Sequence, residues 1–212
     1  MTVLPVPASA QGARPMRRDA ARNHEVVLDA AREVLKEFGP DAGMEQIAGR
    51  AGVGIGTVYR HFPSKDALIE ALVDSVNAEL IALGDAALTR EDGSGLEEFL
   101  RALGGTFREH RMYATILLAR PRPNCAADRI RAQLAALTEQ ARAVGAVRED
   151  VAFGDVMVLL WALGGVVEVT GSVAPSAWQR MLDLHLGALR SSDVSSRRRP
   201  VSEAQLRRIN RR

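Results

Sequence analysis

The stretch GVGIGTVYRHF, residues 52–62, combines three closely spaced glycines with four side chains that suit contact with phosphate. Thr57, Tyr59, Arg60 and His61 offer hydroxyl, guanidinium and imidazole groups, which donate hydrogen bonds to phosphate oxygens. A guanidinium can also pair with O6 and N7 of guanine in the major groove of DNA. These residue types therefore indicate binding to a nucleic acid.

Two short helices are predicted to position this stretch. The first covers about residues 44–51, has one apolar side and ends at Gly52. The second covers about residues 56–61, where Val58 points inward and the polar side chains face outward. Two helices joined by a glycine-containing turn follow the helix-turn-helix plan, in which the second helix enters the major groove.

Flanking helices complete a small domain. Apolar residues at spacings of three and four predict a helix from about Asp19 to the pair Gly39 and Pro40, which ends it. Ser64 suits the start of a later helix, because its hydroxyl can accept a hydrogen bond from an unpaired amide of the first turn. We expect that helix to reach about Leu83 and to link the small domain to the rest of the chain.

Residues 44–68, MEQIAGRAGVGIGTVYRHFPSKDAL, resemble the DNA-binding signature of the TetR/AcrR family of bacterial transcriptional regulators. The matching residues are Ile47, Ala48, Ala51, Gly52, Val53, Gly56, Thr57, Val58, Tyr59, His61, Phe62, Ser64, Lys65 and Leu68. The match has no gaps. The helices predicted beyond it resemble the family's ligand-binding and dimerising domain in number and length only.

The resemblance assigns roles to the second helix and its surroundings. Phosphate contacts are implied for Thr57, Tyr59, His61 and Lys65. The positions implied to lie nearest the bases are Ile55, Gly56 and Arg60. Arg60 is best equipped for readout, since a bidentate contact to guanine gives roughly 1 to 3 kcal/mol of discrimination. Packing for Tyr59 and capping of the helix end for His61 are the alternatives.

Two positions of the expected DNA-binding set depart from the family pattern. Position 44 is commonly Thr and here is Met44, while position 54 is commonly Ser and here is Gly54. Glycine still serves as an N-cap, at a cost of a few tenths of a kcal/mol, but it offers no hydroxyl to DNA. We therefore expect contacts at this point to depend more on backbone amides.

Composition predicts an all-α protein. Of the 212 residues, 47% are apolar and 4% aromatic, a balance that suits closely packed helices better than sheets. The single cysteine excludes an internal disulfide framework. The uncharged run at 156–167 is short for a membrane span, so we expect a cytoplasmic protein with no membrane segment.

Charge and proline content suggest four regions, although the net charge is only +2. We expect a disordered basic arm at 1–17, a helix-turn-helix domain at 18–66, a ligand-binding and dimerisation domain at 67–190, and a disordered Arg-rich tail at 191–212. Arginines at 14, 17, 18 and 22 could follow a phosphate strand or enter the minor groove, and a solvated arm is the alternative.

The second half contains no metal-ligand spacing, no phosphate-binding glycine loop and no nucleophile with a nearby base. We therefore expect neither an enzyme nor a cofactor or metal. Trp161 and Glu168 share a helix face with the pair Gly164 and Gly165 between them, which would suit a pocket for an organic ligand. The opposing wall is expected at Phe107, Met112 and Leu117. Alternatively, the glycines permit a close helix crossing at a dimer interface.

The resemblance also implies a homodimer in which the last two long helices of each chain pack together. An apolar stripe on the final helix permits this: Met181, Leu182, Leu186 and Leu189. The expected function is a repressor that binds a palindromic operator in double-stranded DNA and is released by a small-molecule effector. A ligand-independent activator or architectural protein is the alternative, and an α-helical enzyme a remote one.

Overall fold

The computed structural model describes residues 13–110, 125–171, 173–191, 193 and 198–209. Every regular element in this part of the chain is a helix, which confirms the predicted fold class. Contacts divide the chain into two compact units, Met1–Leu72 and Val73–Arg212. The division falls inside the long helix α4 (Lys65–Ala87), and the predicted border at residue 66 lies in the first turn of the same helix.

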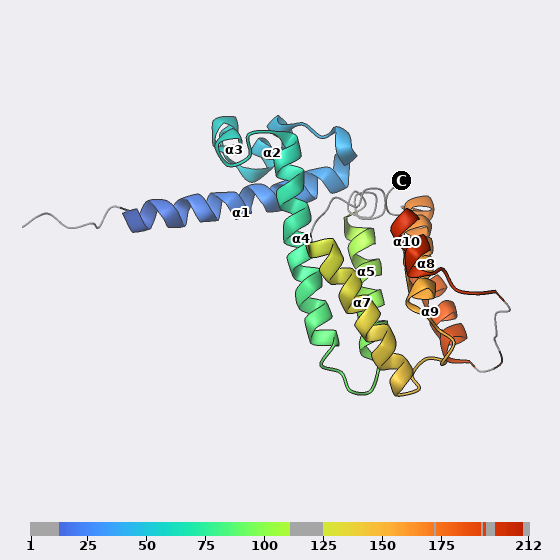
Figure 1. Ribbon diagram of the computed structural model, residues 1–212. Coiled ribbons are helices and arrows are strands. Elements are labelled where there is room, and N and C mark those ends of the chain that lie inside the picture. Colours follow the sequence, from blue (N-terminus) through green and yellow to red (C-terminus); the bar gives the residue numbers. More distant parts are fainter. Residues whose placement is uncertain (1–12, 111–124, 172, 192, 194–197, 210–212) are drawn as a thin grey trace, which may run out of the picture. The chain divides into compact units, whose positions relative to one another are not determined.

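The first unit is a small bundle around one apolar core. Its elements are α1 (Ala13–Phe38), the short turn η1 (Gly39–Asp41), α2 (Met44–Ala51), α3 (Ile55–His61) and the first part of α4 (Figure 1). Helix α1 packs on α2, and α2 packs on α3. The core side chains with no exposed surface are Val27, Ala31, Ile47, Val58 and Leu68.

Local chemistry sets the ends of these helices. Gly39 and Gly52 have φ angles of 72° and 66°, a left-handed conformation that glycine adopts at little cost. Ser64 caps α4 as predicted, because its Oγ accepts a hydrogen bond from the amide of Ala67 at 3.1 Å. Helix α1 already begins at Ala13, so the prediction of disorder is wrong for residues 13–17, and the rest of the predicted arm lies outside the described residues.

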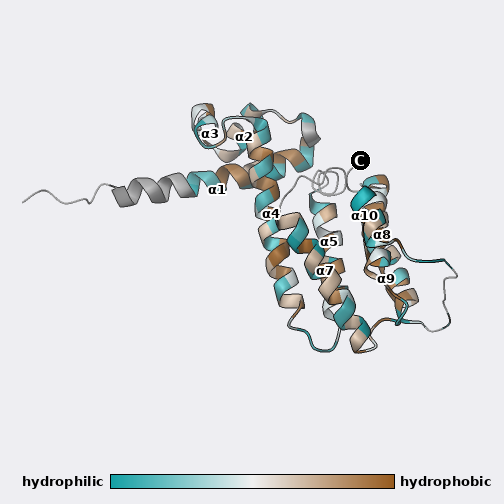
Figure 2. Ribbon diagram, viewed as in Figure 1, coloured by the Kyte–Doolittle hydropathy of each residue, from teal (hydrophilic) through white to brown (hydrophobic). Residues whose placement is uncertain are grey.

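The second unit is a larger bundle. It contains the rest of α4, α5 (Gly95–Glu109), α7 (Cys125–Ala143), α8 (Phe153–Thr170), α9 (Ala177–Arg190) and α10 (Glu203–Ile209). Helix α5 packs against α7, α8 and α9, and α8 packs against α9 (Figure 1). Hydrophobic and hydrophilic residues alternate along these helices (Figure 2), and the hydrophobic ones build the core. The helix predicted at 112–119 lies outside the described residues.

Helix α8 is predominantly apolar, with Asp155 and Glu168 as its charged residues. By length and composition alone it is the one helix in the described part of the chain that could cross a membrane. Its side chains at Val156, Leu160 and Leu163 are buried in the core of the second unit. Packing explains the apolar residues on the buried side of α8, whereas Val158, Ala162, Gly165 and Val169 are exposed.

The prediction of a disordered tail at 191–212 is wrong for its later part, where α10 forms. Ser202 and Gln205 cap this helix reciprocally: the Gln205 side chain accepts from the Ser202 amide at 2.9 Å, and the Ser202 Oγ accepts from the Gln205 amide at 3.3 Å. Leu206 is 5% exposed and belongs to the core of the second unit. The spacing Ser-x-x-Gln before an apolar residue was the signal in the sequence for this helix.

Candidate nucleic-acid interface

A glycine turn holds α3 on the surface of the first unit. Gly52 is left-handed, and the amide of Val53 donates to the carbonyl of Ala48 at 3.1 Å, which closes the end of α2. Gly54 follows in an extended conformation and is the N-cap of α3, as predicted. A methyl group at Gly54 or Gly56 would have no heavy atom within 4 Å, so these glycines leave open space at the tip of the helix.

One side of α3 is anchored and the other is exposed. Val58 has no exposed surface and lies in the core of the first unit. Ile55 and Tyr59 are 38% and 46% exposed although both are large and hydrophobic. Arg60 is exposed, while Thr57 and His61 are half-buried. The outward side of α3 therefore carries the residues that the sequence assigned to DNA.

Arg50 on α2 and Arg60 on α3 differ in whether their guanidinium groups are paired. Arg50 on α2 pairs with Glu33 and Glu37 of α1 at 3.1 and 2.5 Å, and its pKa is raised by the hydrogen bond to Glu37 first and to Glu33 second. Within the described residues, Arg60 makes no hydrogen bond or ion pair. The guanidinium of Arg60 is thus available to an outside partner, whereas that of Arg50 ties α2 to α1.

Met44 does not fit its predicted role. Its side chain is 6% exposed and belongs to the core of the first unit, next to Ile47 and Ala48 on the buried side of α2. A side chain packed in the core cannot reach a phosphate, so any contact of position 44 with DNA would have to come from its backbone. Lys65, by contrast, is half-buried at the first residue of α4, and that placement is compatible with its predicted role.

A further ring lies beside the end of α3, contributed by α1. The ring of His24 is 4.7 Å from that of Phe62 and 5.9 Å from that of His61, measured between centroids. No local sequence pattern connects residues 24 and 61. The contact exists only because α1 packs against the other helices of the unit.

The residues predicted for a ligand pocket are spread over different environments. Phe107 has no exposed surface, Trp161 is partly buried against the core, and Glu168 is exposed. Gly164 is buried while Gly165 is exposed with no heavy atom within 4 Å of a methyl group placed there. The structure therefore does not bring the Glu168 carboxylate into the buried surroundings of Phe107. Met112 and Leu117 lie outside the described residues.

Trp178, which the sequence did not single out, carries a buried polar atom. The side chain is 7% exposed, and a methyl group at Gly104 would lie 2.5 Å from its Cζ3 atom, so glycine at 104 makes room for the indole. Among the described residues, the indole Nε1 has no hydrogen-bond partner. A buried unpaired donor costs roughly 1 to 3 kcal/mol, which makes this atom a candidate contact for a ligand.

Helices α8 and α9 each carry an apolar stripe, which is exposed on α8 and, on α9, half-buried except at Leu184. The stripe on α8 consists of Val158, Ala162, Gly165 and Val169, and the stripe on α9 consists of Ala177, Met181, Leu184 and Ala188. Both follow spacings of four, three and four, which place four residues on one helix face. Val169 and Leu184 are 86% and 63% exposed. The predicted stripe on α9 was partly wrong, because Leu182 and Leu186 are 0% and 3% exposed and face the core.

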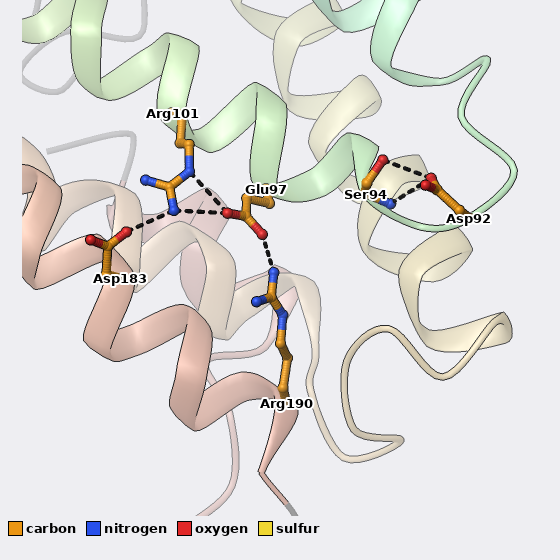
Figure 3. Close-up of polar contacts among 6 residues, drawn as sticks. All are labelled: Asp92, Ser94, Glu97, Arg101, Asp183 and Arg190. Atoms are coloured by element: carbon orange, nitrogen blue, oxygen red, sulfur yellow. Dashed lines mark hydrogen bonds and ion pairs between the residues drawn. The ribbon is translucent and has the colours of Figure 1, made fainter.

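An ion-pair network ties α9 to α5 (Figure 3). Arg101 donates to Glu97 from Nε and Nη2 at 2.9 and 2.7 Å and to Asp183 at 2.7 Å, and Arg190 pairs with the second oxygen of Glu97. Partial burial raises the pKa of Glu97, but the hydrogen bonds from Arg101 and Arg190 outweigh it and lower the pKa. The network fixes the helix that carries the second stripe.

An exposed second helix after a glycine turn, on an anchored three-helix unit, defines a helix-turn-helix DNA-binding protein. Residues 27–72 match the bacterial regulatory proteins of the tetR family, and residues 92–191 match the C-terminal domain of SbtR-like transcriptional regulators. Both halves of the chain thus match parts of transcriptional regulators.

Comparisons with solved structures over most of the chain agree. The chain is 30% identical to the TetR transcriptional regulator SCO0520 from Streptomyces coelicolor, with a TM-score of 0.61 over 80% of this chain and 99% of that one. It is also 30% identical to the TetR transcription regulatory protein from Mycobacterium vanbaalenii, with a TM-score of 0.61 over 84% and 100%. The protein belongs to the TetR family of bacterial transcriptional regulators.

A curated relative matches over a shorter stretch. The HTH-type transcriptional regulator BetI of Klebsiella pneumoniae (strain 342) is 32% identical over 113 residues. That match covers 51% of this chain and 53% of BetI, so the chain spans about half the length of this relative.

Proposed function

We propose that the protein is a homodimeric repressor that binds a palindromic operator through α3 and is released by a small-molecule effector. The observation that carries this proposal is the outward side of α3, where the guanidinium of Arg60 stands without a partner among the described residues. A short helix of this kind fits the major groove, and its neighbouring side chains reach the phosphates.

The residues on and beside α3 have separate proposed tasks at the operator. The phosphate contacts are Thr57, Tyr59, His61 and Lys65, and the base-facing positions are Ile55, Gly56 and Arg60. The open space at Gly54 and Gly56 lets the backbone at the tip of α3 approach the DNA closely, where its first amides are unpaired within the helix. Sequence readout then depends mostly on Arg60, because the tip carries few side chains that can donate hydrogen bonds.

The partner of the two apolar stripes is a second copy of the chain. Two apolar stripes on adjacent helices of one chain, brought against the same stripes of another, form a four-helix interface with a two-fold axis. The methyl group of Ala162 and the absence of a side chain at Gly165 permit a close approach of the helices. A two-fold dimer presents two copies of α3, which explains why one short recognition helix per chain suffices for a palindromic operator.

The effector is proposed to bind in the second unit and to accept a hydrogen bond from Nε1 of Trp178. A ligand that supplies this acceptor would satisfy a donor that is buried and unpaired among the described residues. Release from DNA requires that the ligand bind more tightly to a conformation that does not match the half-site spacing. On the operator, the dimer would block access of the polymerase in the cytoplasm.

Selection from a random duplex library tests operator binding. The purified protein should enrich a palindrome with half-sites about one helical turn apart, and its affinity for that sequence should fall steeply with salt. The DNA upstream of its own gene is the first natural duplex to compare with the selected sequence. Enrichment of no sequence over the starting library would contradict the proposal.

Fluorescence tests effector binding separately. The chain has two tryptophans, Trp161 and Trp178, both in the second unit. A panel of small carbonyl and carboxylate compounds is titrated into the protein and into the variant Trp178→Phe. A compound that binds should change the tryptophan emission of the native protein and release the native protein from the selected palindrome. Its affinity for the variant should be at least several-fold weaker. Release with equal affinity for the variant would move the effector site away from Trp178.

A further inference from the structure

Three aromatic rings meet where α3 ends. His24 comes from α1, while His61 and Phe62 are the last residue of α3 and the residue after it. The rings of His24 and Phe62 are 4.7 Å apart and inclined by 33°, and those of His24 and His61 are 5.9 Å apart at 72°, close to an edge-to-face arrangement. His61 and Phe62 are 6.3 Å apart.

Phe62 is the fixed member of this group. Its side chain is 2% exposed and lies in the core of the first unit, and its amide donates to the carbonyl of Val58 at 2.8 Å. His24 is half-buried on a helix that packs into the same core, so its ring is held against Phe62. His61 is also half-buried, with the ring of His24 on one side of it.

We propose that His24 is a positioning residue for DNA binding, which acts by holding the imidazole of His61 in the orientation that meets a phosphate. The inference rests on the proposed function, in which His61 is a phosphate contact. Edge-to-face pairs place the positive edge of one ring on the negative face of the other, which restricts the second ring to few orientations. A side chain ordered before binding loses less conformational entropy when DNA arrives.

The ring of His24, and not its polar atoms, carries this role. If His24 had a purely structural role, its removal would lower the stability of the whole first unit. If His24 contacted DNA directly, that contact would need its ring nitrogens. Phenylalanine at position 24 keeps a ring against Phe62 and His61 but removes the nitrogens. The pair of variants His24→Ala and His24→Phe therefore separates the three roles.

The experiment measures affinity for the palindrome selected by the protein, with full-length His24→Ala, His24→Phe, His61→Ala and the double variant of His24→Ala and His61→Ala. We expect His24→Ala to weaken binding about two- to tenfold, the range of a single aromatic pair. His24→Phe should restore most of that loss. The double variant should bind no more weakly than His61→Ala alone, because the effect of His24 passes through His61.

A second measurement observes His61 without DNA. The chain has four histidines, so ring signals of the labelled protein are assigned with the single variants. His24→Ala should shift the His61 ring signals, and His24→Phe should keep a ring-induced shift. Urea unfolding of each variant then measures the stability of the first unit.

Three results would overturn the inference and leave the proposed function intact. Additive losses in the double variant would show that His24 does not act through His61. Equal weakness of His24→Phe and His24→Ala would show that a ring nitrogen of His24 contacts DNA. A loss of affinity matched by a loss of folded protein would leave only a structural role. If instead His61→Ala binds the palindrome normally, the proposed phosphate contact itself is wrong, and His24 has nothing to position.

Discussion

Two faces of this protein differ in their chemistry although both are formed by helices. The outward side of α3 combines large side chains with donors, such as Tyr59 and Arg60, around glycines that leave open space. The stripes on α8 and α9 are apolar and made of small or aliphatic side chains, with Val169 86% exposed. A face of donors suits a charged polymer, whereas an apolar face is stable in water only when another apolar face covers it.

The two faces also differ in how they are supported. Helix α3 is anchored by Val58 and a ring cluster, while α9 is held to α5 by buried leucines and by the ion pairs in Figure 3. Substitutions that change the exposed side chains of one face, and leave the contacts that hold its helix in place, therefore test whether that face binds DNA or a second copy of the chain.

The largest effect is expected for Leu184→Arg, which places a charge in the proposed dimer interface. An unpaired buried charge costs roughly 3 to 5 kcal/mol, so the dimer dissociation constant should rise by a factor of about 100 or more. Analytical ultracentrifugation measures the oligomeric state, and operator affinity should fall with it. Gln179→Arg adds the same charge at another exposed position of α9 and should leave the dimer intact. A dimeric Leu184→Arg protein would show that this stripe faces something other than a second copy.

Arg60→Ala tests the DNA face and should have the next largest effect. Loss of a bidentate contact to guanine removes roughly 1 to 3 kcal/mol of discrimination, so the preference for the selected palindrome over random duplex should fall about 5- to 150-fold. Fluorescence anisotropy with both duplexes measures the ratio. Lys36→Ala, an exposed charge change in the last turn of α1, should leave that ratio unchanged. An unaltered preference in Arg60→Ala would place sequence readout on another residue.

Gly154→Ala tests the support of the second unit by its C-terminal helix. A methyl group at position 154 would lie 2.0 Å from the carbonyl oxygen of Val201, so the segment that leads into α10 must move. Such overpacking costs roughly 1 to 3 kcal/mol and should detach and unfold α10, so that trypsin cleaves faster at Arg207 and Arg208, which are exposed but helical in the native protein. Limited proteolysis measures the cleavage rate. Gly105→Ala has no neighbour within 4 Å and is the matched control. Unchanged cleavage would show that α10 docks without needing glycine at 154.

Glu97→Gln should have the smallest effect, about 1 kcal/mol at neutral pH, because the ion pairs are partly exposed. The lowered pKa of Glu97 means that its stabilisation is present above the ordinary value of 4.5 and is lost as pH falls through the lower pKa of the folded state. The difference in urea unfolding free energy between native protein and variant should therefore shrink below about pH 4.5. Glu91→Gln, in an exposed loop, is the control. A constant difference across pH would exclude the charge of Glu97 as its cause.

Much of the first unit could be predicted because its signals are local. The glycine turn at 52–54, the cap at Ser64 and the inward position of Val58 each follow from residues a few places apart. The capping box of α10 was equally local, with Ser202 and Gln205 three residues apart, and it was overlooked because the surrounding charges suggested disorder. Where the contacts that set a turn or a helix end lie within a few residues of each other, the spacing of residues in the sequence is enough to predict that turn or end.

The sequence by itself determined that the chain is helical and which helix carries the side chains proposed to contact DNA. The tertiary structure alone decided which of several apolar faces is buried. Met44 lies in the core and Leu184 on the surface, although the sequence indicated DNA for the first and did not single out the second. Helix α9 has apolar residues on two sides, so periodicity cannot choose between them, and only packing against α5 and α8 does. The contact between His24 and His61 likewise arises from packing, because no local pattern links residues from two separate helices.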